Sequence, residues 1–251
     1  MTIITKNLIR WILGKLGYRI TKLDPSRRPI FGLDSFFPLL KQFGFAPKHI
    51  IDVGANWGNW TRTAIRYFPD AHYTLVEPQD HLKIHVQDLI DRGYKIRWIN
   101  AGAGDTPGTL PFTIAHRDDS SNFLSTAEQA ASAGFRQIPT TVKTLNEIAS
   151  SSGISLPEMV KIDAEGFDLK VLAGASDLLG KTDIFLVEAC VCSISGENTV
   201  AEVVKWMTNA GYRLIDITDL NRSPKYEVLW LCELAFLRDD SPLLTQVTSY
   251  E

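Results

Sequence analysis

The sequence predicts an α/β protein in which an open, mostly parallel sheet carries helices on both faces. Short apolar, β-branched segments alternate with helical segments along most of the chain, which is typical of a parallel sheet built from strand–helix–strand units. A chain of 251 residues with 45% hydrophobic residues can form one full core, so we expect a single domain over residues 31–251. Acids close several expected strands, at the edge where such sheets bind ligands.

The first 30 residues differ in composition from the rest. Lys and Arg greatly outnumber the single acid, Asp24, and apolar residues recur near helical spacing. We therefore expect residues 1–30 to be a basic N-terminal extension with an amphipathic helix over residues 3–17. Its cations are solvated if the helix docks on the domain; the alternative is weak contact with a membrane surface or a partner.

The elements are expected in a regular order. Asp34 is expected to cap a helix from Ser35 to Phe43, which Gly44 ends. Further strands are expected at 49–53, 72–78, 95–101, 136–143, 158–163, 182–190, 212–218 and 229–238, with a hairpin arm at 108–115. Helices are expected at 59–67, 79–91, 144–150, 169–179 and 200–210, a loop or short helix at 120–134, and a frayed tail at 237–251.

Composition excludes several functional classes. A formal charge of −3 and a pI near 6.0 argue against general binding of nucleic acid. Cys190, Cys192 and Cys232 lack the spacing of a zinc site or a disulfide framework, so we expect reduced thiols in a cytoplasmic protein. No apolar run reaches the ~18 residues of a membrane span.

The segment His49–Trp60 has the layout of a ligand-binding turn. Gly54 and Gly58 follow an apolar strand, but Asn56 stands where a dinucleotide site has its second glycine. Asn tolerates left-handed backbone angles, so the turn can form, whereas a bulky pyrophosphate fits less easily. S-adenosylmethionine has no phosphate and carries a sulfonium and an ammonium, both positive.

Four acids end expected strands and give the cleft a negative lining: Asp52, Glu77, Asp163 and Glu188. Asp52 can orient the turn or accept, directly or through water, from the cofactor ammonium. Glu77 is placed to accept both ribose hydroxyls, although the equivalent acid of a dinucleotide enzyme does the same. The sign of the lining thus favours a cationic nucleoside.

The stretch "VKIDAEGFDLKVLAGA", with "IDVGANWGNWT", "LVEP" and "TLNEI" at their spacings, resembles the FkbM family of S-adenosylmethionine-dependent methyltransferases. The resemblance runs from about residue 48 to residue 190. It implies a class I methyltransferase (Rossmann-like) fold, with a seven-stranded sheet whose last strand is antiparallel. It also implies O-methylation of a hydroxyl on a small molecule, sugar or natural-product scaffold.

The resemblance also implies positions around S-adenosylmethionine. It places Asp52, Gly54, Ala55, Asn56 and Gly58 at the methionine part, Glu77 on the ribose, and Asn100, Ala101 and Asp105 around the adenine. Asp163 would sit at the methyl-transfer edge. Ser121 and Asn122 would touch cofactor or acceptor.

A hydroxyl acceptor needs a base or a metal that lowers its pKa. Asp163, Glu165 and Glu188 are the candidate catalytic residues, and His116 is a further candidate base. Glu165 has a structural alternative as the cap of the helix that follows it. Asp163 and Glu188 could hold magnesium, but no tight ligand set supports a metal.

Two rival functions remain open: an NAD-dependent oxidoreductase on a related sheet, and a non-catalytic cofactor-binding protein of a biosynthetic assembly. The first lacks the glycine pattern of a pyrophosphate-binding turn. Trp57 and Trp60, three residues apart, are interpreted as packing the helix, with a cation–π contact of Trp57 to the sulfonium as the alternative. The sequence predicts neither the acceptor nor the oligomeric state.

Overall fold

The computed structural model describes residues 31–151, 153–192 and 197–249. The amphipathic helix predicted over residues 3–17 lies outside these ranges. No helix among the described residues combines the length and the apolar character needed to cross a membrane.

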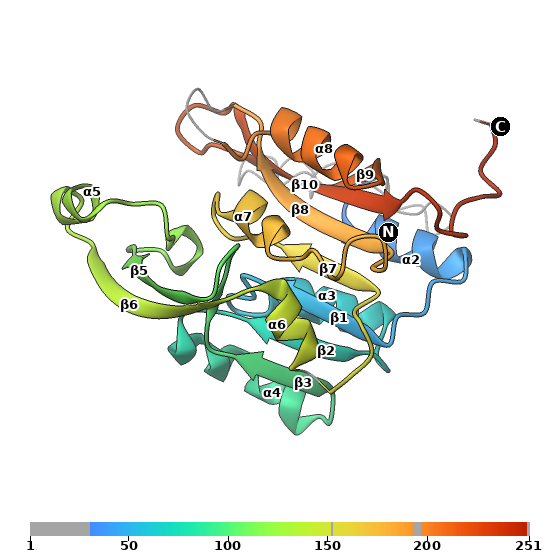
Figure 1. Ribbon diagram of the computed structural model, residues 1–251, viewed down its shortest axis with the longest axis horizontal. Coiled ribbons are helices and arrows are strands. Elements are labelled where there is room, and N and C mark those ends of the chain that lie inside the picture. Colours follow the sequence, from blue (N-terminus) through green and yellow to red (C-terminus); the bar gives the residue numbers. More distant parts are fainter. Residues whose placement is uncertain (1–30, 152, 193–196, 250–251) are drawn as a thin grey trace, which may run out of the picture. The chain divides into compact units, whose positions relative to one another are not determined.

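A seven-stranded sheet organises the described part of the chain (Figure 1). Its strands are β1 (His49–Val53), β2 (His72–Val76), β3 (Lys95–Ile99), β7 (Met159–Ile162), β8 (Ile184–Cys190), β9 (Tyr212–Arg222) and β10 (Leu229–Arg238). Their order is β3-β2-β1-β7-β8-β10-β9. All neighbouring pairs from β3 to β8 are parallel, and β10 is antiparallel to both its neighbours. The predicted mostly parallel sheet with an antiparallel last strand is confirmed.

The central strands are buried on both faces, which explains their continuous apolar runs. Every residue of β1 and β7 is buried. From β1 the chain builds outward through β2 and β3, then returns to place β7 on the other side of β1. The carboxyl ends of β1 and β7 therefore form the topological switch point, where sheets of this type bind ligands.

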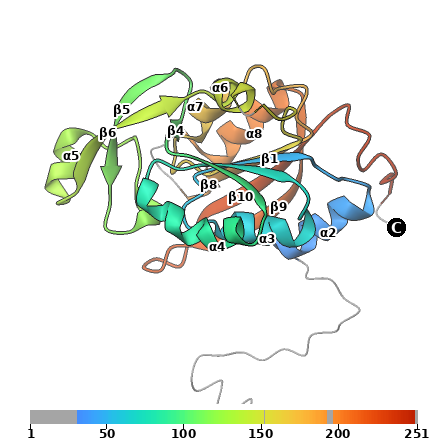
Figure 2. The same cartoon turned by 90° about the horizontal axis from the view of Figure 1, so that it is seen from below.

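Helices cover both faces of the sheet, as predicted (Figure 2). One face carries α2 (Leu33–Gln42), α3 (Asn59–Tyr67), the 3₁₀ helix η1 (Asp80–Val86) and α4 (Gln87–Asp91). The other face carries α6 (Leu145–Ser150), α7 (Asp168–Ala173) and α8 (Val200–Asn209). Each set of helices closes its own hydrophobic cluster against the sheet.

A small second sheet extends from the main body (Figure 1). It has the order β4-β6-β5, from β4 (Gly102–Ala103), β5 (Gly108–Ile114) and β6 (Arg136–Lys143). Between β5 and β6 lie η2 (Asp118–Ser120) and α5 (Ala127–Ser132), the latter with a capping box at Thr126. The hairpin arm was expected, but not its pairing into a separate sheet.

Several predicted boundaries are wrong. Helix α2 begins at Leu33 after Gly32, and the Asp34 carboxylate accepts hydrogen bonds from Arg66 and Tyr67 instead of capping the helix. The segment predicted as one helix over 79–91 is divided into η1 and α4. Helix α7 ends at Ala173, because Gly174 packs against the backbone of the loop after β4. Within the predicted tail, Leu243 is buried.

Candidate functional site at the switch point

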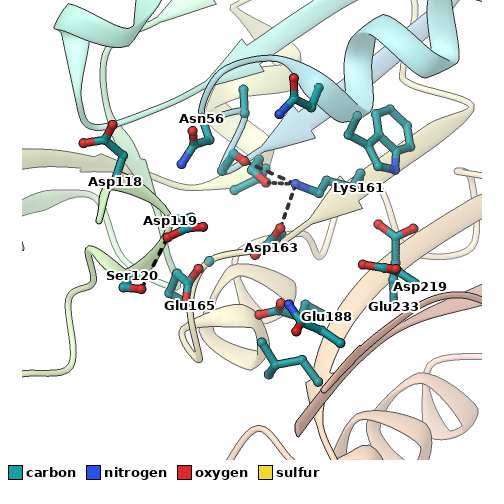
Figure 3. A pocket seen from close by; sticks show the side chains of 18 of the residues that line it. Asn56, Asp118, Asp119, Ser120, Lys161, Asp163, Glu165, Glu188, Asp219 and Glu233 are labelled. Carbon is teal, nitrogen blue, oxygen red and sulfur yellow. Dashed lines mark hydrogen bonds and ion pairs between the residues drawn. The ribbon is translucent and has the colours of Figure 1, made fainter. Parts of the chain in front are cut away.

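A cavity of about 1360 Å³ opens at the carboxyl ends of β1 and β7 (Figure 3). Small-molecule sites usually occupy about 300–1,000 Å³, so this cavity has room for a nucleoside and a second molecule. Its lining comes from the turn after β1, the end of β2, the segment after β5, the segment after β7, and strands β8 to β10.

The turn after β1 requires glycine at its first position. Gly54 has a φ of +70°, and a Cβ on it would lie 1.8 Å from the carbonyl oxygen of Asp163. The amides of Gly54 and Ala55 donate to the carbonyl of Val76 on β2. Asn56 has a φ of +45°, as its expected left-handed tolerance allows. The turn therefore brings β1, β2 and the end of β7 into direct contact.

Asp52 faces the protein interior. Its side chain is fully buried and does not line the cavity. The Thr61 hydroxyl donates to Asp52 Oδ2 at 2.5 Å, and Lys161 Nζ lies 3.4 Å from Oδ1. Burial raises the pKa of Asp52, while Lys161 opposes that rise. Of the two roles expected for Asp52, this geometry provides orientation of the turn and not direct contact with a ligand in the cavity.

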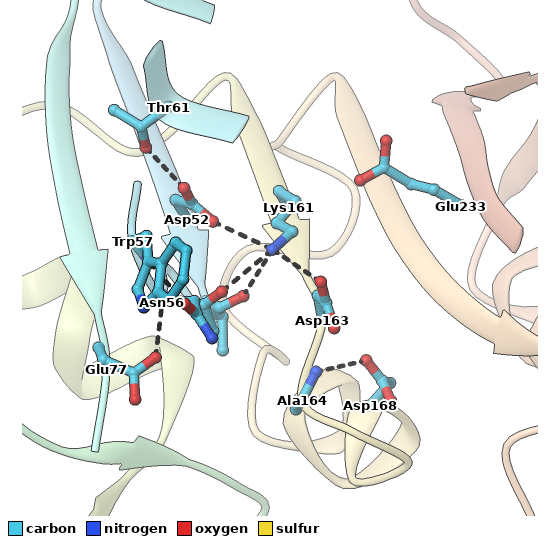
Figure 4. Close-up of polar contacts among 12 residues, drawn as sticks. Asp52, Asn56, Trp57, Thr61, Glu77, Lys161, Asp163, Ala164, Asp168 and Glu233 are labelled. Atoms are coloured by element: carbon cyan, nitrogen blue, oxygen red, sulfur yellow. Dashed lines mark hydrogen bonds and ion pairs between the residues drawn. The ribbon is translucent and has the colours of Figure 1, made fainter. Parts of the chain in front are cut away.

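Lys161 is the central cation of the site, and the sequence reasoning gave it no role (Figure 4). Its Nζ lies 3.1 Å from Asp163 Oδ2 and 3.2 Å from the backbone oxygen of Gly54, in addition to Asp52. Burial opposes its charge, but the carboxylates of Asp163, Asp52 and Glu233 raise its pKa above the ordinary value. A lysine inside the apolar strand "MVKI", next to acids, was the signal available.

Glu77 lies at the carboxyl end of β2 and lines the cavity with 3% of its surface exposed. Its Oε2 accepts from the amide of Asn56 at 3.0 Å, and its Oε1 from the amide of Gln79 at 2.9 Å. Burial raises the pKa of Glu77, and these two amides oppose the rise. Gln79 also lines the cavity and was missed from the sequence.

Of the three residues expected around an adenine, one lines the cavity and two do not. Ala101 is buried and lines the cavity. Asn100 does not line it; its Nδ2 donates to the carbonyl oxygens of Glu77 and Pro78 and so shapes the end of β2. Asp105 lies outside the lining and pairs with Lys170 at 3.4 Å.

Gly58 stands outside the lining as well. It precedes α3 with a φ of +73°, and a Cβ there would lie 2.4 Å from Val86 Cγ1. The close approach explains the second glycine of the turn by packing of α3 against the segment that follows β2.

The three predicted catalytic acids, Asp163, Glu165 and Glu188, all line the cavity (Figure 3). Glu165 has a φ of +52°, an uncommon backbone angle for a residue with a side chain. Burial, Asp163 and Asp168 raise the pKa of Glu165 to about 8. Burial and the neighbouring acids also raise the pKa of Glu188 well above its ordinary value.

Asp168, not Glu165, satisfies the backbone before α7. Its carboxylate accepts from the amides of Ala164 at 2.9 Å and Gly166 at 3.0 Å, and from Asn198 Nδ2 at 2.8 Å. Burial raises its pKa to about 7. The structural alternative for Glu165 is therefore wrong, because Asp168 already bonds the amides of this turn.

Strand β10 adds an acid that the sequence reasoning missed. Glu233 lines the cavity, is 8% exposed, and accepts from the Thr218 hydroxyl at 2.5 Å. Burial raises its pKa to about 7.

Among the described residues, no group of three or more His, Cys, Asp or Glu side chains is arranged to hold a metal ion.

The rim of the cavity comes from the segment between β5 and α5. His116 and Ser121 line the cavity; the His116 ring packs on Phe135, with centroids 5.2 Å apart. Ser121 Oγ accepts from the amide of Ala115. Asn122 lies outside the lining, and its Oδ1 accepts from the two amides that follow Phe123.

The two tryptophans of the turn behave differently. Trp60 packs edge-on against Phe37, with ring centroids 5.6 Å apart, as expected. Trp57 is 47% exposed, lines the cavity, and donates from Nε1 to Asp118 Oδ2 at 3.2 Å. The packing prediction holds for Trp60 and is wrong for Trp57.

Solved structures with a similar fold include several methyltransferases. Precorrin-6y C5,15-methyltransferase from Geobacter metallireducens is 10% identical, covers 80% of this chain and 85% of its own, and has a TM-score of 0.45. 1,6-Didemethyltoxoflavin-N1-methyltransferase from Burkholderia thailandensis is 14% identical, with 81% and 76% covered and a TM-score of 0.43. An O-methyltransferase from neocarzinostatin biosynthesis is 10% identical, with 76% and 49% covered and a TM-score of 0.40.

Among curated proteins, none matches the chain. At these identities, the solved structures say nothing about the substrate or the activity of this chain. A separate comparison finds that the methyltransferase FkbM domain matches residues 52–214. These residues span the turn after β1, the cavity acids that follow β7 or lie on β8, and the start of β9. The chain belongs to the FkbM methyltransferase family.

Proposed function

We propose that this protein transfers the methyl group of S-adenosylmethionine to a hydroxyl of a small molecule, sugar or natural-product scaffold. The observation that carries the proposal is the switch-point cavity of a methyltransferase-family chain, lined by acids on both sides of the glycine turn. Bound there, S-adenosylmethionine would supply an electrophilic methyl group for in-line displacement, so positioning dominates catalysis.

The cofactor end of the cavity is assigned to the turn after β1 and the end of β2. Gly54 lets the turn pack directly against the Asp163 carbonyl, and Asn56 presents a left-handed backbone beside it. Glu77 is held by two backbone amides, and its Oε2, which accepts from Asn56 alone, retains a lone pair for a ribose hydroxyl. The residues fit a nucleoside without phosphate, because Glu77 and Asp163 line this end and the ammonium of Lys161 is already paired with carboxylates.

The acceptor base is assigned to Glu188. Its carboxylate lines the cavity and forms no hydrogen bond with another described residue. A base works best when its pKa lies near the operating pH, and the pKa of Glu188 is raised by burial and by Asp163. Asp163 is a weaker candidate, because its Oδ2 already pairs with the ammonium of Lys161 at 3.1 Å. Glu165 is the second candidate base.

The rest of the assignment follows the family. Residues 31–251 would form one methyltransferase domain, with residues 1–30 as an extension. Acceptor specificity would come from the segments 1–45, 115–137 and 192–199, of which His116 and Ser121 line the cavity rim. We propose a cytoplasmic enzyme that acts on a small molecule and not on nucleic acid.

A titration of intrinsic tryptophan fluorescence tests cofactor identity, since Trp57 lines the cavity. S-adenosylmethionine and its demethylated product, S-adenosylhomocysteine, should saturate the signal, and NAD should leave it unchanged. Saturation by NAD alone would support the oxidoreductase instead.

Transfer of a labelled methyl group to a metabolite extract tests turnover. The parent should label an acceptor, and Glu188→Gln should reduce the rate about 10²-fold or more while cofactor affinity stays near that of the parent. Glu165→Gln is the matched comparison. Cofactor binding without any labelled product would favour the non-catalytic alternative.

A further inference from the structure

We propose that Lys161 is a positioning residue, whose ammonium holds the Asp163 carboxylate at the cavity and couples it to the glycine turn. The inference rests on the proposed function, because it explains how one acid of that site is held and aimed at the cavity. Nothing in the family match assigns a role to this side chain.

The contacts of Lys161 join the two strands of the switch point (Figure 4). Nζ lies 3.1 Å from Asp163 Oδ2, 3.4 Å from Asp52 Oδ1 and 3.2 Å from the carbonyl oxygen of Gly54. The ammonium donates to the carbonyl oxygens of Gly54 and Val53 and forms ion pairs with the two carboxylates. Asp52 and Gly54 belong to the end of β1, and Asp163 follows β7. One side chain thus ties the turn to the cavity acid.

The burial of the three charged groups differs. The side chain of Lys161 is 5% exposed, Asp52 is fully enclosed, and the side chain of Asp163 is 35% exposed. A buried cation needs a paired anion, and Asp52 already supplies one within the interior. The second partner, Asp163, is the one that meets a ligand in the cavity, so the Lys161–Asp163 contact serves the site.

Asp163 has no cationic neighbour among the described residues apart from Lys161. Carboxylates interact with it from every element packed around it: Asp52 on β1, Glu165 before α7, Asp168 on α7, Glu188 on β8 and Glu233 on β10. Like charges repel one another. Without Lys161, no cation among the described residues would hold the Asp163 carboxylate against its acidic neighbours and aim it at the cavity.

The first test measures affinity for S-adenosylmethionine by titration calorimetry. Lys161→Met removes the charge and keeps most of the side-chain length. We expect its affinity to be about tenfold below that of the parent, which is about 1.4 kcal/mol of binding free energy. An affinity equal to that of the parent in the folded variant would overturn the inference.

The second test is a double-mutant cycle. Asp163→Asn should weaken binding by itself, and Lys161→Met added to it should cause little further loss, because Lys161 acts through Asp163. Additive losses in the cycle would refute the coupling. Lys170→Met is the matched control, since Lys170 makes an exposed pair with Asp105 outside the cavity; its affinity should equal that of the parent.

A further variant separates the loss of the Lys161–Asp163 contact from a loss of stability. Lys161→Met leaves Asp52 buried without a cation, which destabilises the fold. Asp52→Asn/Lys161→Met removes that unpaired charge, and Asp52→Asn alone is its reference for the same comparison of affinity. A parent that fails to bind S-adenosylmethionine refutes the proposed function. A parent that binds it, with folded Lys161-deficient variants of unchanged affinity, refutes only the role of Lys161.

Discussion

Glu188 on β8 and Glu233 on β10 occupy directly opposite positions in the antiparallel register of these strands. Asp219 on β9 is the next residue in the same row, opposite Glu233. Like charges directly opposite each other destabilise a sheet. All three side chains line the cavity. The row therefore lowers the stability of the sheet and makes this side of the cavity negatively charged.

Replacement of Glu233 by Gln should stabilise the ligand-free protein. Gln can still accept from the Thr218 hydroxyl and removes the charge opposite Glu188. We expect a midpoint of thermal unfolding higher by about 2 to 4 °C at about pH 8.5, which corresponds to about 1 kcal/mol. Glu202→Gln, on the exposed side of α8, should leave the midpoint unchanged; a lower midpoint for Glu233→Gln would contradict the prediction.

Buried acids in and beside the cavity set the pH dependence of folding. The pKa values of Glu165, Asp168 and Glu233 are raised to about 8, 7 and 7, so the folded state binds more protons than the unfolded state near neutrality. Their contribution is fully present below the unfolded pKa values and is lost as the pH rises through 7 to 8. Urea unfolding should therefore show stability falling between about pH 5 and pH 9, and Glu233→Gln should flatten that slope.

Gly54→Ala should disrupt the turn far more than Gly44→Ala. Both glycines have positive φ, but a Cβ at Gly44 meets nothing within 4 Å, whereas one at Gly54 would strike the Asp163 carbonyl. We expect a loss of about 1 kcal/mol for Gly44→Ala and about 3 kcal/mol or more for Gly54→Ala. Chemical unfolding measures both. Equal losses would show that backbone angle alone, without the close approach, selects glycine.

Asp168→Ala should destabilise the fold through the turn before α7. The variant leaves the amides of Ala164 and Gly166 and the Asn198 side chain without their acceptor. The expected loss is about 2 to 4 kcal/mol in the free energy of unfolding at about pH 8. Asp70→Ala, at an exposed position, provides the reference and should change it by less than about 0.5 kcal/mol.

Asp105→Ala should leave the affinity for S-adenosylmethionine within about twofold of the parent. The side chain of Asp105 pairs with Lys170 and lies outside the cavity, and an exposed pair contributes about 1 kcal/mol or less. Titration calorimetry of the variant and the parent measures both affinities. A large loss of affinity would restore the adenine contact that the family resemblance implies.

The sequence predicts the sheet better than the site. Strands such as His49–Val53 are short, apolar and bounded by turn residues, so local pattern is enough to locate them. The separate sheet of β4, β5 and β6 depends on pairing between segments distant in the chain, which no local period records. Helix α7 ends early for a related reason, since Gly174 stops it against another loop.

The sequence shows acids at the ends of the expected strands. It does not show which of these acids line the cavity and which are buried in the interior. Whether Asp52 faces a ligand or the interior depends on Lys161, which reaches it only after β7 is placed beside β1. Glu233 lies in a run, "LWLCELAFLR", that reads as an ordinary strand. Its role emerges from the register of β10 with β8, a tertiary property.

The insertion of β10 between β8 and β9 has a consequence for synthesis of the chain. Strand β9 leaves the ribosome first but has no neighbour in the sheet until β10 arrives. The parallel half can assemble while translation continues, whereas the acidic wall closes only once the final hairpin inserts. A nascent chain arrested before residue 229 would therefore display an unpaired β8 edge, and such an edge is a site for aggregation.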